Sequence, residues 1–129
     1  MNYNYLLYFS VLAQTEHYTT AADVLKIAKL AMTNPIISRA AATASMTAYY
    51  VSGESSPWDN SNHLLHSNSA YYCPNAIGLK TGHTKGAGWC LVSAFDENGT
   101  VLIIGVFGSD TVELRNADTV KLYKEFCQN

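Results

Sequence analysis

A lysine interrupts a strand-like apolar stretch of this sequence, and a hydroxyl residue and a glycine follow it, as Lys80-Thr81-Gly82. A charged side chain at such a place needs a physical reason. One reason is the edge of a sheet, where a lysine discourages association with other strands. The other is a binding cleft, where the charge and the hydroxyl meet a ligand and the glycine leaves room for its backbone. The triplet alone does not separate these explanations.

The residues around the triplet favour the binding cleft. Residues 75–84 read NAIGLKTGHT and residues 87–91 read AGWCL. This string resembles the third catalytic motif of serine-type D-alanyl-D-alanine carboxypeptidases, the low-molecular-mass penicillin-binding proteins of peptidase family S11. Residues 17–23 (HYTTAAD) and 62–65 (NHLL) are also similar to segments of that family. The resemblance covers roughly residues 16–127.

The resemblance implies a substrate-binding role for Lys80, Thr81, Gly82 and His83. The Lys80 ammonium would make the cleft positive, and the Thr81 hydroxyl would hydrogen-bond the terminal carboxylate of a peptidoglycan stem peptide ending in D-Ala-D-Ala. Gly82 would let the ligand lie close to the strand, and the backbone N–H of His83 would be an oxyanion-hole donor. β-Lactams are the other implied ligands.

The sequence lacks the residues that would complete this chemistry. The family's nucleophile lies in a Ser-x-x-Lys motif, and a Ser-x-Asn motif completes the proton relay. No serine here is followed by lysine three residues later or by asparagine two residues later. We therefore expect no complete catalytic site and no acylation by this chain.

Two other functions stay open. The first is a non-catalytic module that binds a carboxylate-ended peptide or a β-lactam. The second is a complementation module, onto which a separately encoded half with Ser-x-x-Lys docks. The resemblance itself implies the carboxy-terminal half of a transpeptidase domain, because the family's Asn-Pro-His-Gly-Leu turn is absent before His17.

Composition limits the partners of this chain. Its 129 residues are 48% hydrophobic and 14% charged, which suits one globular domain. The formal net charge is −2, from eight Lys and Arg against ten Asp and Glu. This balance provides no basic surface for a nucleic acid or an anionic membrane. A small molecule or a protein is the expected partner.

Histidine and cysteine residues do not form a recognisable metal motif. His63 and His66 are close to Cys73 in sequence, but a single His-x-x-His without a spaced cysteine pair is weak support for zinc. We expect no metal and no cofactor. Cys90 and Cys127 are expected to be inert, packed thiols.

Periodicity and turn residues predict an α+β fold that resembles part of a β-lactamase/transpeptidase domain. A Thr20/Asp23 capping box and an Asn34-Pro35 start each introduce a helix. Asp110 is the expected N-cap of the last helix. The predicted helices span residues 20–33, 35–44 and 110–127, and the predicted antiparallel strands span residues 77–84, 88–96 and 100–108. A separate strand is expected at 47–51, followed by an exposed loop at 52–62.

The amino-terminal segment 1–15 has an ambiguous pattern, strand or helix, whereas 16–129 form the partial domain. Residues 101–107 are apolar on both faces, so their strand should be central. We expect residues 3–11, or a second copy of the protein, to cover its free edge. No basic residue precedes the apolar stretch within residues 1–14, so we predict neither an export signal nor an anchor. The resemblance implies export to the periplasm or the outer face of the cytoplasmic membrane, which leaves the compartment open.

Overall fold

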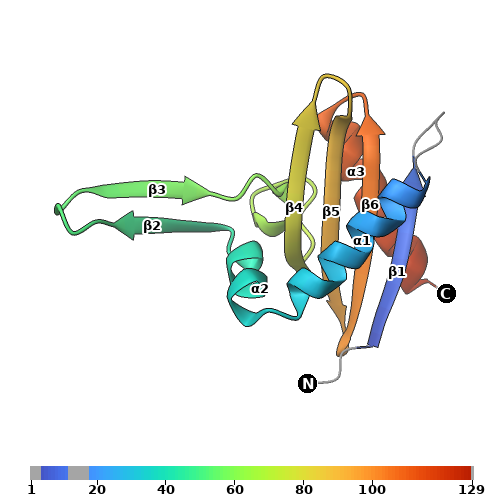
Figure 1. Cartoon of the computed structure of the whole chain (residues 1–129), viewed down its shortest axis with the longest axis horizontal. Coiled ribbons are helices and arrows are strands. Elements are labelled where there is room, and N and C mark those ends of the chain that lie inside the picture. Colours follow the sequence, from blue (N-terminus) through green and yellow to red (C-terminus); the bar gives the residue numbers. More distant parts are fainter. Residues whose placement is uncertain (1–3, 12–17, 129) are drawn as a thin grey trace.

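A mixed four-stranded sheet forms the centre of the computed structural model, which describes residues 4–11 and 18–128 (Figure 1). Strands β4 (Ala76–Thr84), β5 (Gly88–Glu97) and β6 (Thr100–Ser109) are antiparallel neighbours. Asn98 and Gly99 connect β5 to β6, and both have positive φ angles, 54° and 86°, as this hairpin turn requires. The three predicted antiparallel strands are therefore confirmed.

The fourth strand, β1 (Asn4–Val11), pairs with β6 in the parallel direction, with Leu7 opposite Ile103. This strand occupies the free edge of β6, which was one of the two solutions expected for that edge. The pattern of residues 1–15 left strand or helix open, and it did not predict this parallel pairing. Alternating apolar residues indicate a strand but contain no information about the direction in which it pairs. Residues 101–106 are buried, so β6 is central as predicted.

Helices cover both faces of the sheet (Figure 1). Helices α1 (Tyr18–Met32) and α2 (Pro35–Ala42) lie on one side, where Leu25 packs against Ile103 in a first apolar core. Helix α3 (Val112–Cys127) lies on the other side, where a second core contains Phe95 and Leu102. In the described part of the chain, no helix is long and apolar enough to cross a membrane.

The predicted helix starts were partly wrong. Helix α1 begins at Tyr18, so Thr20 lies inside the helix and cannot be its N-cap. The N-cap of α3 is Thr111 rather than Asp110, and the Thr111 hydroxyl accepts a hydrogen bond from the backbone N–H of Leu114. Asn34 caps α2 as predicted, because its side chain accepts bonds from two backbone N–H groups.

A separate hairpin of β2 (Ser45–Tyr49) and β3 (Ser55–Asp59) extends away from the sheet (Figure 1). Its second strand replaces the exposed loop predicted for residues 52–62, and its first strand begins before the predicted 47–51. Pro57 indicated a loop rather than a strand, because proline has no backbone N–H to donate to the hydrogen bonds between strands. In a ribbon of two strands, however, each strand has a free edge, and proline is tolerated there.

The 310 turn η1 (His63–Leu65) follows this hairpin and returns the chain to the sheet. Its Leu64 side chain is fully buried in the α3-side core, together with Cys73 and Leu91. This agrees with the similarity of residues 62–65 to a family segment that precedes the third motif. The turn and the asparagine before it place the neighbouring polar residues beside β4.

The turn between β4 and β5 provides the first test of the fold. Gly88 has a φ of 68°, and a Cβ there would lie 2.9 Å from the carbonyl oxygen of Ser109. We expect Gly88→Ala to lower the free energy of unfolding by about 1 kcal/mol or more, from backbone strain and the clash. Gly86→Ala, where a Cβ meets no atom within 4 Å, should change it by less than about 0.5 kcal/mol. Equal effects of the two substitutions in urea titrations would contradict this description.

Candidate functional site

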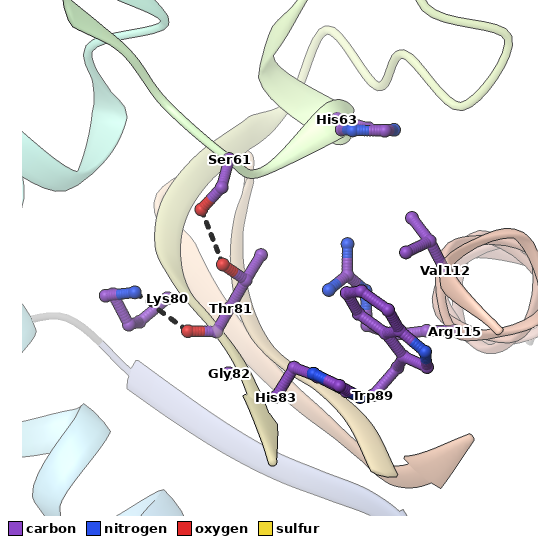
Figure 2. A pocket seen from close by; sticks show the side chains of 9 residues that line it. All are labelled: Ser61, His63, Lys80, Thr81, Gly82, His83, Trp89, Val112 and Arg115. Carbon is purple, nitrogen blue, oxygen red and sulfur yellow. Dashed lines mark hydrogen bonds between the residues drawn. The ribbon is translucent and has the colours of Figure 1, made fainter. Parts of the chain in front are cut away.

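A pocket of about 350 Å³ lies between β4, η1 and the start of α3 (Figure 2). Its lining contains all four residues that the sequence singled out, Lys80, Thr81, Gly82 and His83, together with Ser61, His63, Trp89, Val112 and Arg115. The structure therefore brings the predicted residues together at one place. Their binding role stays a prediction that this geometry motivates.

The predicted residues divide between the two faces of β4. Thr81 is paired with Leu91, which belongs to the core on the α3 side, whereas Lys80 is paired with Val92 of the α1-side core. In Figure 2, Lys80 extends away from Arg115, and its ammonium donates a hydrogen bond of 2.8 Å to the Thr81 carbonyl. Lys80 thus lines the rim of the pocket, while the Thr81 hydroxyl is directed at the Ser61 hydroxyl on the opposite face of β4 (Figure 2).

A network of asparagine side chains holds the segment after the hairpin against β4. The buried side chain of Asn62 donates to the Gly78 carbonyl at 3.1 Å and accepts from the Leu64 N–H at 3.1 Å. The Asn60 side chain in turn accepts from the Asn62 N–H at 3.0 Å. This arrangement places the Ser61 hydroxyl 2.5 Å from the Thr81 hydroxyl. Two hydroxyl groups from different segments therefore share one hydrogen bond at the pocket.

Arg115 is the cation in the interior of the pocket. Its side chain is only 3% exposed, and its guanidinium carbon lies 5.9 Å from the centre of the Trp89 ring. The Trp89 ring also stacks on His83, with 3.8 Å between ring centroids. Within residues 4–11 and 18–128, no carboxylate forms an ion pair with Arg115, whose Nε–H donates to the Asn116 side chain.

Burial without an anionic partner makes Arg115 electrostatically unfavourable. Desolvation is the main cause that lowers the pKa of the Arg115 guanidinium from its ordinary value. An arginine stays protonated in proteins, so this burial costs free energy that a bound anion would offset. A carboxylate is the natural ligand, since the guanidinium presents paired N–H donors in one plane. The pocket can therefore hold a carboxylate between Arg115 and the hydroxyl pair.

The edge position of β4 leaves room for a ligand backbone. No described strand pairs with β4 on the side away from β5. A Cβ at Gly82 would meet no protein atom within 4 Å, so the protein itself does not require a glycine there. Any steric need for Gly82 must come from a bound molecule. The oxyanion role of the His83 N–H stays a prediction of the family resemblance.

The most important residue that sequence reasoning missed is Arg115. The apolar spacing from Leu114 to Phe126 predicted the buried face of the last helix, but the side chain of Leu114 is 48% exposed. Val120, Tyr123 and Phe126 of the predicted face do pack against the α3-side core, but the fully buried positions on α3 are polar, namely Arg115, Asn116 and Thr119. Polar residues three to four positions apart could have indicated this buried face of the helix. The prediction missed it because it used only apolar residues to identify buried positions.

The other candidate ligands, two histidines and a cysteine, do not lie together. His63 lines the pocket, whereas the Nε2 atom of His66 lies 2.6 Å from the Asn60 carbonyl oxygen. Cys73 is buried, and burial raises the pKa of its thiol, which does not favour a thiolate nucleophile. The residues with described coordinates contain no group of three or more side chains arranged to hold a metal ion.

Comparisons with known proteins identify the family of this chain. A family model of D-alanyl-D-alanine carboxypeptidases matches residues 9–111. A D-alanyl-D-alanine carboxypeptidase of Streptomyces sp. strain K15 is 33% identical over 119 residues, which are 88% of this chain and 39% of that protein.

Solved structures show the same partial match. The Streptomyces K15 DD-transpeptidase is 33% identical, with a TM-score of 0.68 over 79% of this chain and 39% of that one. Penicillin-binding protein D2 of Listeria monocytogenes, in its cefotaxime-bound form, is 30% identical, with a TM-score of 0.62 over 78% and 37%. This chain therefore spans 39% of the length of the Streptomyces relative.

The asparagine network generates a test of how the pocket is held. We expect Asn62→Ala to lower the free energy of unfolding by about 1–3 kcal/mol, because it leaves buried backbone groups without partners. The neighbouring Ser61→Ala should change it by less than about 0.5 kcal/mol, since Ser61 is exposed. Urea denaturation followed by tryptophan fluorescence measures both. A neutral Asn62→Ala would show that the network does not hold this segment.

Proposed function

Because this chain belongs to the D-alanyl-D-alanine carboxypeptidase family, we propose that its pocket binds the free carboxylate of peptides ending in D-Ala-D-Ala. The observation that supports this most directly is the buried Arg115, which faces a pocket with two hydroxyl groups and forms no ion pair in the described structure, although the charge of Glu113 partly offsets its burial. The fold matches part of the family's transpeptidase domain, and this partial match is the basis on which we interpret the pocket.

The hydroxyl pair supplies a hydrogen bond to the carboxylate. Ser61 and Thr81 carry two hydroxyl hydrogens, and their mutual bond uses one of them. The other can be donated to a carboxylate oxygen while Arg115 donates to the same group. Lys80 adds positive potential from the rim without direct contact being required.

The backbone of the ligand would lie along β4. An extended peptide can add to an exposed strand edge by main-chain hydrogen bonds, and side-chain pockets then determine which peptide is bound. Gly82 leaves the necessary space at this edge. The His83 N–H would face the carbonyl group of the terminal peptide bond, as the family resemblance implies.

Binding by the pocket alone is expected to be weak and not to lead to hydrolysis. The 129 residues contain neither Ser-x-x-Lys nor Ser-x-Asn, so no activated hydroxyl is available to attack the bound carbonyl. We expect dissociation constants in the millimolar range or weaker, which is about 4 kcal/mol of binding free energy. β-Lactams, one of which is bound to the Listeria relative, should likewise associate without forming an acyl-enzyme.

A titration with Nα-acetyl-D-Ala-D-Ala, followed by NMR, tests this proposal. We expect concentration-dependent shifts of the Thr81, His83 and Trp89 amides in the wild type. Arg115→Gln should weaken binding at least tenfold, about 1.4 kcal/mol, because it removes the buried charge. Lys85→Gln is the control, since it removes an exposed positive charge outside the lining of the pocket.

Thr81→Val provides a second variant in case Arg115→Gln fails to fold, and it should also weaken binding. Flat titrations of the folded wild type would contradict the proposal. So would wild-type affinity in both Arg115→Gln and Thr81→Val.

A second candidate function is complementation by a polypeptide that carries the missing motifs. Large apolar side chains are exposed on the outer surfaces of α1 and α2, with exposed fractions of 67% for Ile27, 71% for Leu30 and 79% for Ile36. The predicted docking place, the free edge of residues 100–108, is occupied by β1. The exposed apolar side chains instead favour docking on these two helices.

The proposed occupant is a family polypeptide that includes Ser-x-x-Lys and Ser-x-Asn. It corresponds to the part of the relatives that this chain does not span, 61% of the Streptomyces protein when its 39% coverage is subtracted from 100%. Such a polypeptide would cover Ile27, Leu30 and Ile36 and would supply the nucleophile. A homo-oligomer of this chain is the competing occupant and would provide no nucleophile.

Mixing this chain with the corresponding amino-terminal polypeptide of the Streptomyces relative tests complementation. We expect a fluorescent penicillin to label the serine of that polypeptide only in the mixture. Leu30→Asp should abolish labelling, because it places a charge in the apolar contact, while Lys85→Gln should not. Labelling of this chain alone would contradict the absence of an acylation site. A mixture that stays unlabelled, with this chain forming a homo-oligomer by light scattering, would contradict complementation.

A further inference from the structure

The β2–β3 hairpin leaves one edge of β2 without a partner strand. Within residues 4–11 and 18–128, these two strands form a sheet of their own, and the hairpin extends away from the main sheet (Figure 1). Every residue of β2 except Ala48 is exposed, and its sequence, SMTAY, contains no charge and no proline. A ribbon of two strands gains little stability on its own. The hairpin is therefore a place where another strand can add.

Hydrogen bonds beyond the two ends of β2 show which backbone groups face outward. The Tyr50 N–H donates to the Glu54 carbonyl at 2.9 Å, and the Asn60 N–H donates to the Ala44 carbonyl at 2.8 Å. In an antiparallel ladder, such bonded pairs alternate with pairs whose N–H and C=O groups point away from each other. The outward-pointing residues are thus Ser45, Thr47 and Tyr49 on β2, and Ser55, Pro57 and Asp59 on β3.

The two outer edges of the hairpin differ in their ability to accept a strand. The outer edge of β3 has Pro57 at its centre, which has no N–H to donate, and the charged Asp59 at its end. Proline and charge are common means by which an edge strand avoids association. The outer edge of β2 has neither, because Ser45, Thr47 and Tyr49 each present a donor and an acceptor. The hairpin is thus blocked on one side and open on the other.

We propose that the open edge of β2 pairs in the antiparallel direction with the same edge of a second copy of this chain. Only outward-pointing residues can exchange hydrogen bonds, so the register with the most bonds has its two-fold axis at Thr47. Thr47 then faces Thr47 of the second copy, and Ser45 faces Tyr49 of the second copy. Each of these pairs exchanges two main-chain hydrogen bonds. The result is one continuous sheet in the order β3, β2, β2, β3.

The apolar face of this sheet fits a second copy. Met46 is opposite Trp58 of its own hairpin, and their side chains are 56% and 59% exposed. In the proposed register, Met46 would also be next to Ala48 of the second copy, in a closely spaced pair without main-chain bonds. Because the axis repeats this contact, both Met46 and both Trp58 side chains would lie on one face of the sheet. Apolar surface that each copy exposes alone would thereby be covered.

The polar face of the sheet also favours a second copy over an unrelated strand. Ser45 is opposite Asp59 in its own hairpin. Tyr49 of the second copy would lie beyond the small Ser45 side chain, where its hydroxyl can donate to the Asp59 carboxylate. The same register brings no like charges together, since β2 itself is uncharged. Both faces are therefore complementary to the same strand of another copy.

Light scattering of the full chain over a range of concentrations tests this inference. We expect the mass to rise from 14.1 kDa towards twice this value as the concentration increases, because a contact along one strand edge is small and the dimer weak. Thr47→Pro should raise the concentration needed for dimerisation by about tenfold or more, because it removes the N–H at the two-fold axis. Ser55→Pro is the matched control, since it makes the same change on the outer edge of β3 and should leave dimerisation unchanged.

Thr47→Lys provides a second variant in case Thr47→Pro disturbs the hairpin. It should also weaken the dimer, because it would place two ammonium groups opposite each other at the axis. Amide hydrogen exchange followed by NMR locates the contact. The N–H groups of Ser45, Thr47 and Tyr49 should be protected at high concentration and should exchange faster on dilution, because they face solvent in the monomer.

Several results would overturn this inference. A wild type that stays monomeric at millimolar concentration would do so, and it would leave the edge to a different polypeptide. A dimer that persists in both Thr47→Pro and Thr47→Lys, or that Ser55→Pro weakens as strongly, would contradict pairing through β2. A dimer that is lost in Leu30→Asp but kept in both Thr47 variants would place the contact on α1 instead.

Discussion

The hydrogen bond from Asn62 to the Gly78 carbonyl is the contact on which the arrangement of the pocket beside β4 depends. It fixes the segment after the hairpin to the side of the edge strand β4 that faces away from β5, where no described strand is paired. An unpaired edge carbonyl would otherwise face the interior, where loss of a partner is costly. Because Asn62 is held at its side chain and at its backbone, Ser61 on one side and His63 on the other have defined positions relative to Thr81.

The second constraint is the burial of polar groups on α3. A helix that packs on a sheet usually buries an apolar stripe, and α3 has one, but its fully buried residues are the polar Arg115, Asn116 and Thr119. The Asn116 Nδ2 atom has no hydrogen-bond partner in the described structure. Such groups reduce stability, and native folds retain them chiefly where binding or chemistry requires them. Their occurrence beside the pocket is therefore an independent reason to interpret it as a ligand site.

The sequence was sufficient for the elements that depend on local patterns. The strands around residues 77–108 were predictable because an Asn-Gly turn and two apolar faces identify a buried hairpin, and Asn34-Pro35 identified the start of α2. The parallel pairing of β1 and the β2–β3 hairpin were not predictable, since pairing direction and pairing across Pro57 depend on tertiary contacts. The triplet at Lys80 identified one wall of the pocket. Arg115 and Ser61 complete it from distant segments, and their proximity to Thr81 appears only in three dimensions.

Binding a substrate and reacting with it require different residues, so a pocket without a nucleophile can still contribute binding. Catalysis requires interactions that are stronger in the transition state than in the bound substrate. In the proposed complex, Arg115 and the hydroxyl pair contact a carboxylate that does not react, so these contacts would stabilise the bound substrate and the transition state equally. These contacts can hold the scissile bond of a ligand along β4. The reaction is accelerated only if another segment also supplies an attacking hydroxyl. Under the proposed function, a chain with these residues and no Ser-x-x-Lys contributes recognition, and the exposed Ile27, Leu30 and Ile36 are where we propose that a partner with the reacting group docks.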